Sequence, residues 1–443
     1  MTAVVVFALQ CLGVAVMRWG APVWGALAST AAFLVFARRR REDVGSGGES
    51  ETGAGRLWLV AGVTALAALV RFWRIGDVPP GIWLDEGRSG LWTIRFLEGK
   101  TMWGMPEGPE PMSIYLFGAA FKVFGVSLTV SRAVSAVAGT LTVPLLAWAV
   151  APVYGGTIGL LSAACLAASR WHILLSRLGT CYVFLPLCVV LMLGFVVRAW
   201  ISGRWIHWVA AGAALGLGLY SYLPARAWPV IVLGSLCWAG LRDRQGLRRT
   251  PGILVLTGIL VLTALPLVWH FAMSPRLLWM RFDSLSASFF ESPVKMGLWN
   301  VARALGVFLV HGDGSIVSSF PEDPQSPALG IAGGALLLLG LPFVVSVANT
   351  LWNRLLVLWF ASLLAISAVT GLSQVRLSSA LPLVCLLQGL GLARLPGTAA
   401  WRRSCWRWAG RKPPGSSTRG VAAPIPDRWK RSSGCAIECW RGN

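Results

Sequence analysis

Two adjacent carboxylates, Asp85 and Glu86, are the clearest candidates in this chain for acid–base catalysis. A carboxylate can accept a proton from a reacting group. The pair stands out because the 443-residue chain holds only 18 acidic residues against 39 basic ones. The same pair could instead be a solvated turn and a helix cap. Which interpretation holds depends on the structural elements that surround the pair.

Those elements are predicted to be membrane helices. The chain is 56% hydrophobic, and its apolar runs reach the length that crosses a bilayer. A backbone in lipid must satisfy its own hydrogen bonds, so each run is expected to be helical. The predicted fold class is an all-α polytopic membrane protein with about 12 transmembrane helices. The runs are 3–18, 21–37, 57–75, 129–151, 156–172, 182–200, 206–222, 227–241, 252–270, 328–347, 352–370 and 376–394.

The net charge of +21 is explained by topology and does not require nucleic acid as a partner. The densest basic segments are Arg38–Arg41, the 242–249 loop and the tail after 396. All three fall on one side of the membrane when twelve helices are threaded alternately. By the positive-inside rule this side is cytoplasmic. We expect a multi-pass protein of the plasma (inner) membrane whose two termini face the cytoplasm and whose partners include the bilayer itself.

The acidic residues indicate that the opposite, extracytoplasmic face is the functional one. Two long loops, 76–128 and 271–327, emerge there and contain eleven of the eighteen acidic residues. No acidic residue lies within a predicted helix, whereas an ion-coupled transporter usually carries a carboxylate near the bilayer midplane. This distribution favours chemistry or binding at the outer surface. The first loop is expected to contain short interfacial helices, in LDEGRSGLWTIRFLEG and in MSIYLFGAAFKVFG.

Several arginines also lie near this outer face, against the positive-inside rule. Arginine at a membrane end is costly unless it has a partner or ligand, although such residues can also snorkel to the surface. The exceptions are Arg71, Arg74, Arg170, Arg177, Arg226, Arg276, Arg281 and Arg376.

Four segments follow from these patterns. We predict an N-terminal transmembrane hairpin (1–41), a flexible cytoplasmic linker (42–56), a membrane domain (57–395) and a basic, disordered cytoplasmic tail (396–443). The cysteines show neither a metal-ligand spacing nor a disulfide framework. No cofactor is predicted, and dependence on a divalent metal is left open.

Five motifs in order resemble those of glycosyltransferase family 39, the protein O-mannosyltransferase and aminoarabinose transferase relatives with the GT-C fold. The resemblance covers about 57–395. Its motifs are Asp85-Glu86 with Glu98-Gly99, EPMSIYLFGAAFKVFG (110–125), SRAVSAVAGTLTVP (131–144), SRWHILLSR (169–177) and LGLGLYSYLPARAWP (215–229). Weaker matches are HGDGS (311–315) and QVRLSSALP (374–382). This chain departs from the family at two places. It has Glu110-Pro111-Met112 where many relatives have His-Pro-Pro, so no role is carried over for that histidine, and it has Cys181 where close relatives have a basic residue.

The resemblance implies inverting transfer of a sugar from a polyprenyl-phosphate donor to a lipid, glycan or protein acceptor. It makes Asp85 the expected general base and Glu86 a supporting residue. Cations are needed where negative charge develops on the departing phosphate, and arginine forks suit phosphate oxygens. The expected phosphate ligands are Arg132, Arg177, Arg226 and Arg376. The expected substrate-binding residues are His172, Tyr222 and Asp313.

Each of these residues also has a simpler interpretation. His172 could be an interfacial hydrogen-bonding residue, Tyr222 an aromatic-belt residue and Asp313 part of a turn. Two other functions also remain open, a lipid-linked sugar flippase or transporter and a non-enzymatic membrane scaffold. The first is disfavoured by the absence of midplane carboxylates, and the second by the costly arginines that gather near one face.

Overall fold

The fold is all-α, as predicted. The computed structural model describes residues 53–100, 111–242, 248–276, 286, 289–310, 327–346 and 351–395, and every regular element within these ranges is a helix. The predicted N-terminal hairpin, most of the 42–56 linker and the 396–443 tail lie outside the described residues. The first described helix, α3, begins at Gly53, within the segment that the sequence predicts to be a linker.

Membrane-spanning helices are present in the described part of the chain, but the predicted count of twelve is not confirmed, because the first two predicted spans lie outside it. Among the described residues, six helical segments are long and apolar enough to cross a membrane, or seven if one bent pair counts as a single span. Others are apolar but short, such as the 14-residue α10. The six involve α3 (Gly53–Phe72), α6 (Leu128–Tyr154), α9 (Phe184–Ser202), α13 (Thr250–Met273), α17 (Leu351–Thr370) and α18 (Gln374–Leu377) continued by α19 (Leu381–Arg394).

The bent pair shows how one residue divides an apolar run. The sequence predicts a single helix over 156–172, whereas α7 (Gly156–Ala168) and α8 (Arg170–Arg177) meet at 60°. Ser169 between them has an extended backbone, and its Oγ accepts a hydrogen bond from the His172 N–H at 3.4 Å. Serine is a preferred N-cap because its side chain replaces a missing helical acceptor. The bend directs α8 against α3 and α6.

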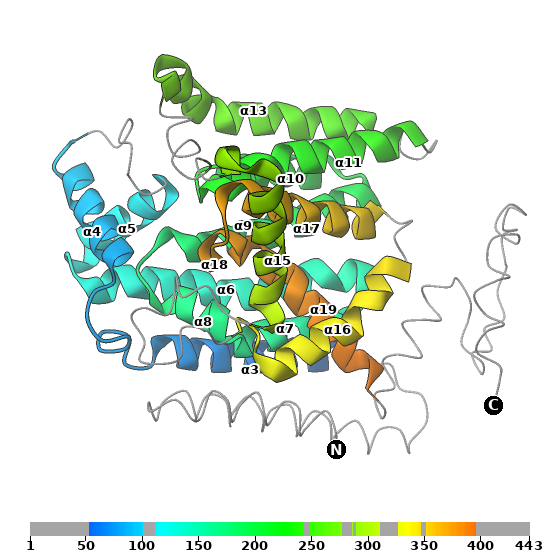
Figure 1. The fold of residues 1–443 in the computed structure, drawn as a ribbon, viewed down its shortest axis with the longest axis horizontal. Coiled ribbons are helices and arrows are strands. Elements are labelled where there is room, and N and C mark those ends of the chain that lie inside the picture. Colours follow the sequence, from blue (N-terminus) through cyan, green and yellow to red (C-terminus); the bar gives the residue numbers. More distant parts are fainter. Residues whose placement is uncertain are drawn as a thin grey trace, which may run out of the picture. The chain divides into compact units, whose positions relative to one another are not determined.

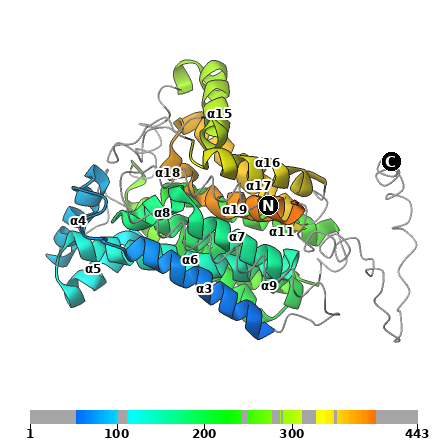
Figure 2. The ribbon, with the colours of Figure 1, turned by 90° about the horizontal axis from the view of Figure 1, so that it is seen from below.

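Small residues allow the central helices to pack closely. Gly159 of α7 lies so near α6 that an added Cβ would stand 2.7 Å from the Ala147 carbonyl oxygen. Gly340 of α16 (Gly330–Ser346) and Gly391 of α19 face backbone carbonyls of the other helix in the same way. Small residues at helix interfaces are typical of membrane proteins, where close backbone approach replaces hydrophobic association. Figure 2 shows α3, α6, α7 and α19 side by side.

The first loop contains the two short helices that the sequence predicts, α4 (Leu84–Leu97) and α5 (Pro111–Phe124). They pack on one another, with Phe96 and Tyr115 in an edge-to-face arrangement at 5.2 Å, and both views place them together at one end of α6 (Figures 1 and 2). The remaining helices are α10 (Trp205–Gly218), α11 (Trp228–Arg242), α15 (Pro293–Leu309) and the short η1 (Cys181–Val183), η2 (Leu223–Ala227) and η4 (Ser378–Ala380).

Candidate active site

Glu86 is a buried anchor at the start of α4. It is 3% exposed, and its Oε2 accepts a hydrogen bond at 3.1 Å from the N–H of Trp83, the residue that precedes the helix. Its Oε1 accepts the Gly179 N–H at 2.8 Å. A glutamate in the first helical turn satisfies an orphan N–H group and is favoured by the helix dipole. Glu86 therefore joins the first loop to the segment that follows α8.

Arg132 on α6 completes this anchor. Its Nε donates to Glu86 Oε1 at 2.8 Å and its Nη2 to Glu86 Oε2 at 2.9 Å, a two-pronged ion pair with no exposed surface on either side chain. The same guanidinium donates to the carbonyls of Pro79 at 2.9 Å and Gly81 at 2.8 Å. Every nitrogen of this buried group thus bonds the protein. The geometry does not support the direct phosphate contact predicted for Arg132.

Arg177, a second predicted phosphate ligand, holds the end of α3. Its Nη1 donates to the carbonyls of Val70 at 2.6 Å and Arg71 at 3.0 Å. Its Nη2 donates to those of Trp73 at 2.6 Å and Val78 at 2.8 Å. The last carbonyls of a helix have no intrahelical partner, and Arg177 supplies donors to them. Arg177 is 6% exposed, so its observed role is to organise the loop that leads into α4.

His172, a predicted substrate ligand, lies in a buried cluster with Arg71. Neither side chain is exposed. The His172 Nδ1 lies 2.8 Å from the Arg71 Nη2, and Arg71 also approaches the Leu166 and Ala167 carbonyls at 3.4 Å. Arg71 therefore caps the end of α7, which explains its place near the outer face. This burial does not support the substrate contact predicted for His172.

Asp85 differs from its neighbour Glu86. Its side chain is half-buried, and its Oδ2 accepts a hydrogen bond from the Tyr182 hydroxyl at 2.7 Å. Within the described part of the chain no hydrogen bond to Oδ1 is present. Tyr182 in turn packs edge-to-face on Tyr222 at 5.0 Å and lies 6.2 Å from the Trp83 ring. The structure thus connects one predicted carboxylate, through Tyr182, to the predicted substrate-binding residue Tyr222.

The two remaining arginines lie on segments that meet this aromatic cluster. Arg226 lies in η2, the short helix that begins directly after Tyr222. Its guanidinium lies 4.8 Å from the centre of the Phe271 ring. Arg376 precedes Ser378, whose Oγ lies 3.5 Å from the Tyr182 carbonyl oxygen. Both arginine side chains are half-buried, in contrast to Arg132, and the Arg376 Nη2 donates to the carbonyls of Thr370 at 3.0 Å and Gly371 at 3.2 Å. The remaining predicted residue, Asp313, lies outside the described residues.

Tyr182 is the site residue that the sequence interpretation missed. It directly follows Cys181, which the sequence analysis considered only because close relatives have a basic residue there. One signal was available, because the chain has only five tyrosines. Two of them, Tyr182 and Tyr222, now prove to be in contact with one another.

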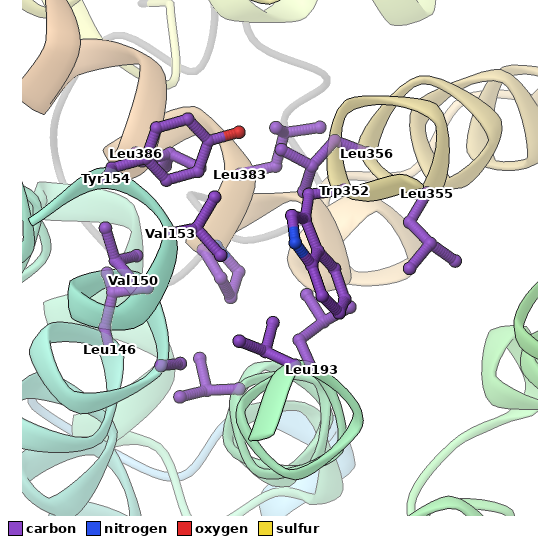
Figure 3. A pocket seen from close by; sticks show the side chains of 14 residues that line it. Leu146, Val150, Val153, Tyr154, Leu193, Trp352, Leu355, Leu356, Leu383 and Leu386 are labelled. Atoms are coloured by element: carbon purple, nitrogen blue, oxygen red, sulfur yellow. The ribbon is translucent and has the colours of Figure 1, made fainter. Parts of the chain in front are cut away.

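A separate cavity lies between α6, α9, α17 and α19 (Figure 3). Its walls are aliphatic and aromatic, and the hydroxyl of one lining residue, Tyr154, bonds the Asn353 Oδ1 at 2.5 Å. Arg132 and Val150, which lines the cavity, are 18 positions apart on α6, or about 27 Å at 1.5 Å per residue. The lining of this cavity holds no carboxylate, histidine, lysine or cysteine, and its one hydroxyl, that of Tyr154, is bonded to Asn353. The surroundings of Asp85, which hold a carboxylate, are therefore the better candidate active site. Over the described ranges, no three His, Cys, Asp or Glu residues cluster as metal ligands would.

Comparisons with known proteins agree with this fold. Residues 107–269 match the family model of dolichyl-phosphate-mannose-protein mannosyltransferase. ArnT from Cupriavidus metallidurans bound to undecaprenyl phosphate has a similar structure, with a TM-score of 0.55 and 18% identity over 81% of this chain and 63% of ArnT. No curated protein matches the sequence significantly.

A second structural relative is the apo oligosaccharyltransferase of Archaeoglobus fulgidus. Its TM-score is 0.54 and its identity 15%, over 80% of this chain and 52% of the relative. The chain therefore spans about half to two thirds of the length of the solved structures it matches. These likenesses establish a fold of the GT-C type for a multi-pass membrane protein.

Proposed function

Because this chain has the GT-C fold and matches the dolichyl-phosphate-mannose-protein mannosyltransferase model, we propose that it is a membrane glycosyltransferase. Its donor would be a sugar linked to polyprenyl phosphate. The sugar passes, with inversion, to a lipid, glycan or protein acceptor at the extracytoplasmic face of the plasma (inner) membrane. The solved structure of ArnT bound to undecaprenyl phosphate supports the choice of donor class. The membrane helices that the structure describes carry no acidic residue near mid-helix, where a coupled transporter usually has one, and this supports transfer over transport.

The observation that carries the proposal is the unequal environment of the two adjacent carboxylates. Glu86 has both oxygens bonded inside the protein, whereas Asp85 keeps one oxygen without an observed partner and is half-buried. Two carboxyl groups with different surroundings take different roles. Asp85 is accordingly the general base, and Glu86 fixes the helix that carries it.

The proposed reaction balances without a cofactor. Asp85 takes the proton of the acceptor hydroxyl or amine while the acceptor oxygen or nitrogen bonds the anomeric carbon. The bond from that carbon to the phosphate oxygen breaks, and its electron pair leaves with the polyprenyl phosphate. Arg226 and Arg376 are assigned to this phosphate. Arg132 and Arg177, which the sequence also suggests for that role, instead hold the loop before α4.

A transfer assay with purified protein in liposomes tests the function. Undecaprenyl-phosphate-linked sugars with a radiolabelled sugar would be presented with membrane lipid and glycan acceptors. We expect label to move from the donor to a water-soluble or differently migrating product. Donor that only crosses the bilayer, with its sugar still attached, would show a flippase instead.

Labelling of single cysteines tests the proposed topology. We expect Gly90→Cys, in α4, to react with a membrane-impermeant maleimide added to intact cells, and Gln245→Cys, in the basic loop, to react only after lysis. A Cβ at position 90 meets no atom within 4 Å, so the first substitution is sterically acceptable. The parent protein with its native cysteines gives the background. The reverse labelling pattern would put Asp85 on the cytoplasmic side and overturn the proposed site.

A further inference from the structure

The Tyr182 hydroxyl donates a hydrogen bond to one oxygen of the Asp85 carboxylate. We propose that Tyr182 is a positioning residue, which holds Oδ2 of Asp85 so that Oδ1 is presented to the acceptor proton. This inference rests on the proposed function and adds to it a residue that neither the motifs nor the comparisons assign. It starts from the 2.7 Å hydrogen bond between Tyr182 Oη and Asp85 Oδ2.

The anchor at Glu86 fixes the backbone of Asp85 but not its carboxylate. Glu86 is bonded to Trp83, Arg132 and Gly179 and so fixes the first turn of α4. An aspartate side chain still rotates about its two χ angles, and the terminal one is broad and weakly restricted. A further contact is needed to select one orientation, and the Tyr182 hydroxyl provides it.

Tyr182 is itself held on several sides. Its side chain is 7% exposed, and it belongs to the short helix η1 (Cys181–Val183). The Tyr222 ring meets it edge-to-face at 5.0 Å, with an angle of 75° between the ring planes. The Trp83 ring lies 6.2 Å away at 59°. A tyrosine ring fixed in this way places its hydroxyl with little freedom, which a surface serine or threonine would not achieve.

In this proposal the two carboxylate oxygens of Asp85 have separate roles. A hydroxyl that donates to a carboxylate forms a short, charge-assisted bond, and this bond occupies Oδ2. Proton transfer from the acceptor then takes place at Oδ1, and Tyr182 keeps its own proton throughout the cycle. Because Tyr182 acts through Asp85, its loss should slow the chemical step and leave substrate binding largely intact. A misplacement of about 1 Å can cost about 10²-fold in rate.

Tyr182→Phe tests the proposal, since it removes the hydroxyl and keeps the ring. In the liposome assay, with the undecaprenyl-phosphate sugar that wild type uses, kcat should fall by about 10- to 100-fold. The KM values for donor and acceptor should stay within about threefold, as expected for an interaction made in the transition state. Tyr154→Phe is the matched control, because it removes another tyrosine hydrogen bond, to Asn353, away from Asp85. This control should retain wild-type kcat.

A double variant separates positioning from a general effect on the fold. If Tyr182 acts through Asp85, adding Tyr182→Phe to Asp85→Asn should cause no further loss of rate, since coupled residues are not additive. A Tyr182→Phe variant with wild-type kcat, or a further loss in the Asp85→Asn background, would overturn the inference and leave the proposed function standing. A wild-type protein that transfers no sugar from any donor would overturn both. Size-exclusion profiles confirm that each variant is folded.

Discussion

Replacement of Asp85 by asparagine is expected to slow sugar transfer by about 10²- to 10⁴-fold, the usual contribution of a general base. Asparagine has the shape of aspartate and can still accept the Tyr182 hydrogen bond, but it cannot take up the acceptor proton. The fold should persist, because the half-buried Asp85 is not part of the buried ion pair at Glu86. The measurement is the single-turnover rate in liposomes, together with the binding of the donor.

The matched control for this variant is Asp77→Asn. Asp77 belongs to the same loop, but its carboxylate is 67% exposed and pairs with Arg74 at the surface. Its removal should leave the transfer rate near that of wild type, because exposed ion pairs contribute little. Near-normal turnover by Asp85→Asn would show that another group takes the acceptor proton.

Replacement of Glu86 by glutamine is expected to destabilise the folded protein, by about 3–5 kcal/mol, because it removes one partner of a buried ion pair. The Arg132 charge would remain without exposed surface and without its counter-ion. The residual folded molecules should still transfer sugar, with a smaller loss of rate per folded molecule than Asp85→Asn. Thermal unfolding in detergent, followed by size-exclusion chromatography, measures the stability, and the rate per folded molecule is measured on the monodisperse fraction.

Glu98→Gln is the control for this second variant. Glu98 pairs with Lys100 at 2.9 Å, but both side chains are more than half exposed. Loss of such a pair typically costs about 0–1 kcal/mol. If Glu86→Gln proved as stable as Glu98→Gln, the buried pair with Arg132 would not be what secures α4.

The sequence was sufficient to predict most of the described membrane helices, because an apolar run of bilayer length can be interpreted locally. The face on which the site lies, inferred from the distribution of arginines, stays a prediction. The break at Ser169 was missed because a serine inside an apolar run is usually tolerated. Ser169 acts as an N-cap only because α8 turns away from α7 and packs against α3 and α6.

The roles of the charged residues could not be predicted in the same way. Arg132 and Arg226 look alike in the sequence, one near the start of a helix and one after a tyrosine. Only the fold shows that Arg132 meets a glutamate 46 positions earlier and four backbone carbonyls of the intervening loop. Tyr182 was missed for the same reason, because its partner lies 97 positions away. Contacts between distant segments depend on packing, which no local pattern contains.

The anchor of Glu86 also sets an order for the maturation of the protein. During synthesis Glu86 emerges 46 residues before Arg132 and 93 residues before Gly179, both of which it needs. Until α6 has been inserted, its carboxylate has no counter-ion, and α4 has no fixed place on the membrane. The chain therefore cannot present an assembled site to its substrates until the segment after α8 has been synthesised.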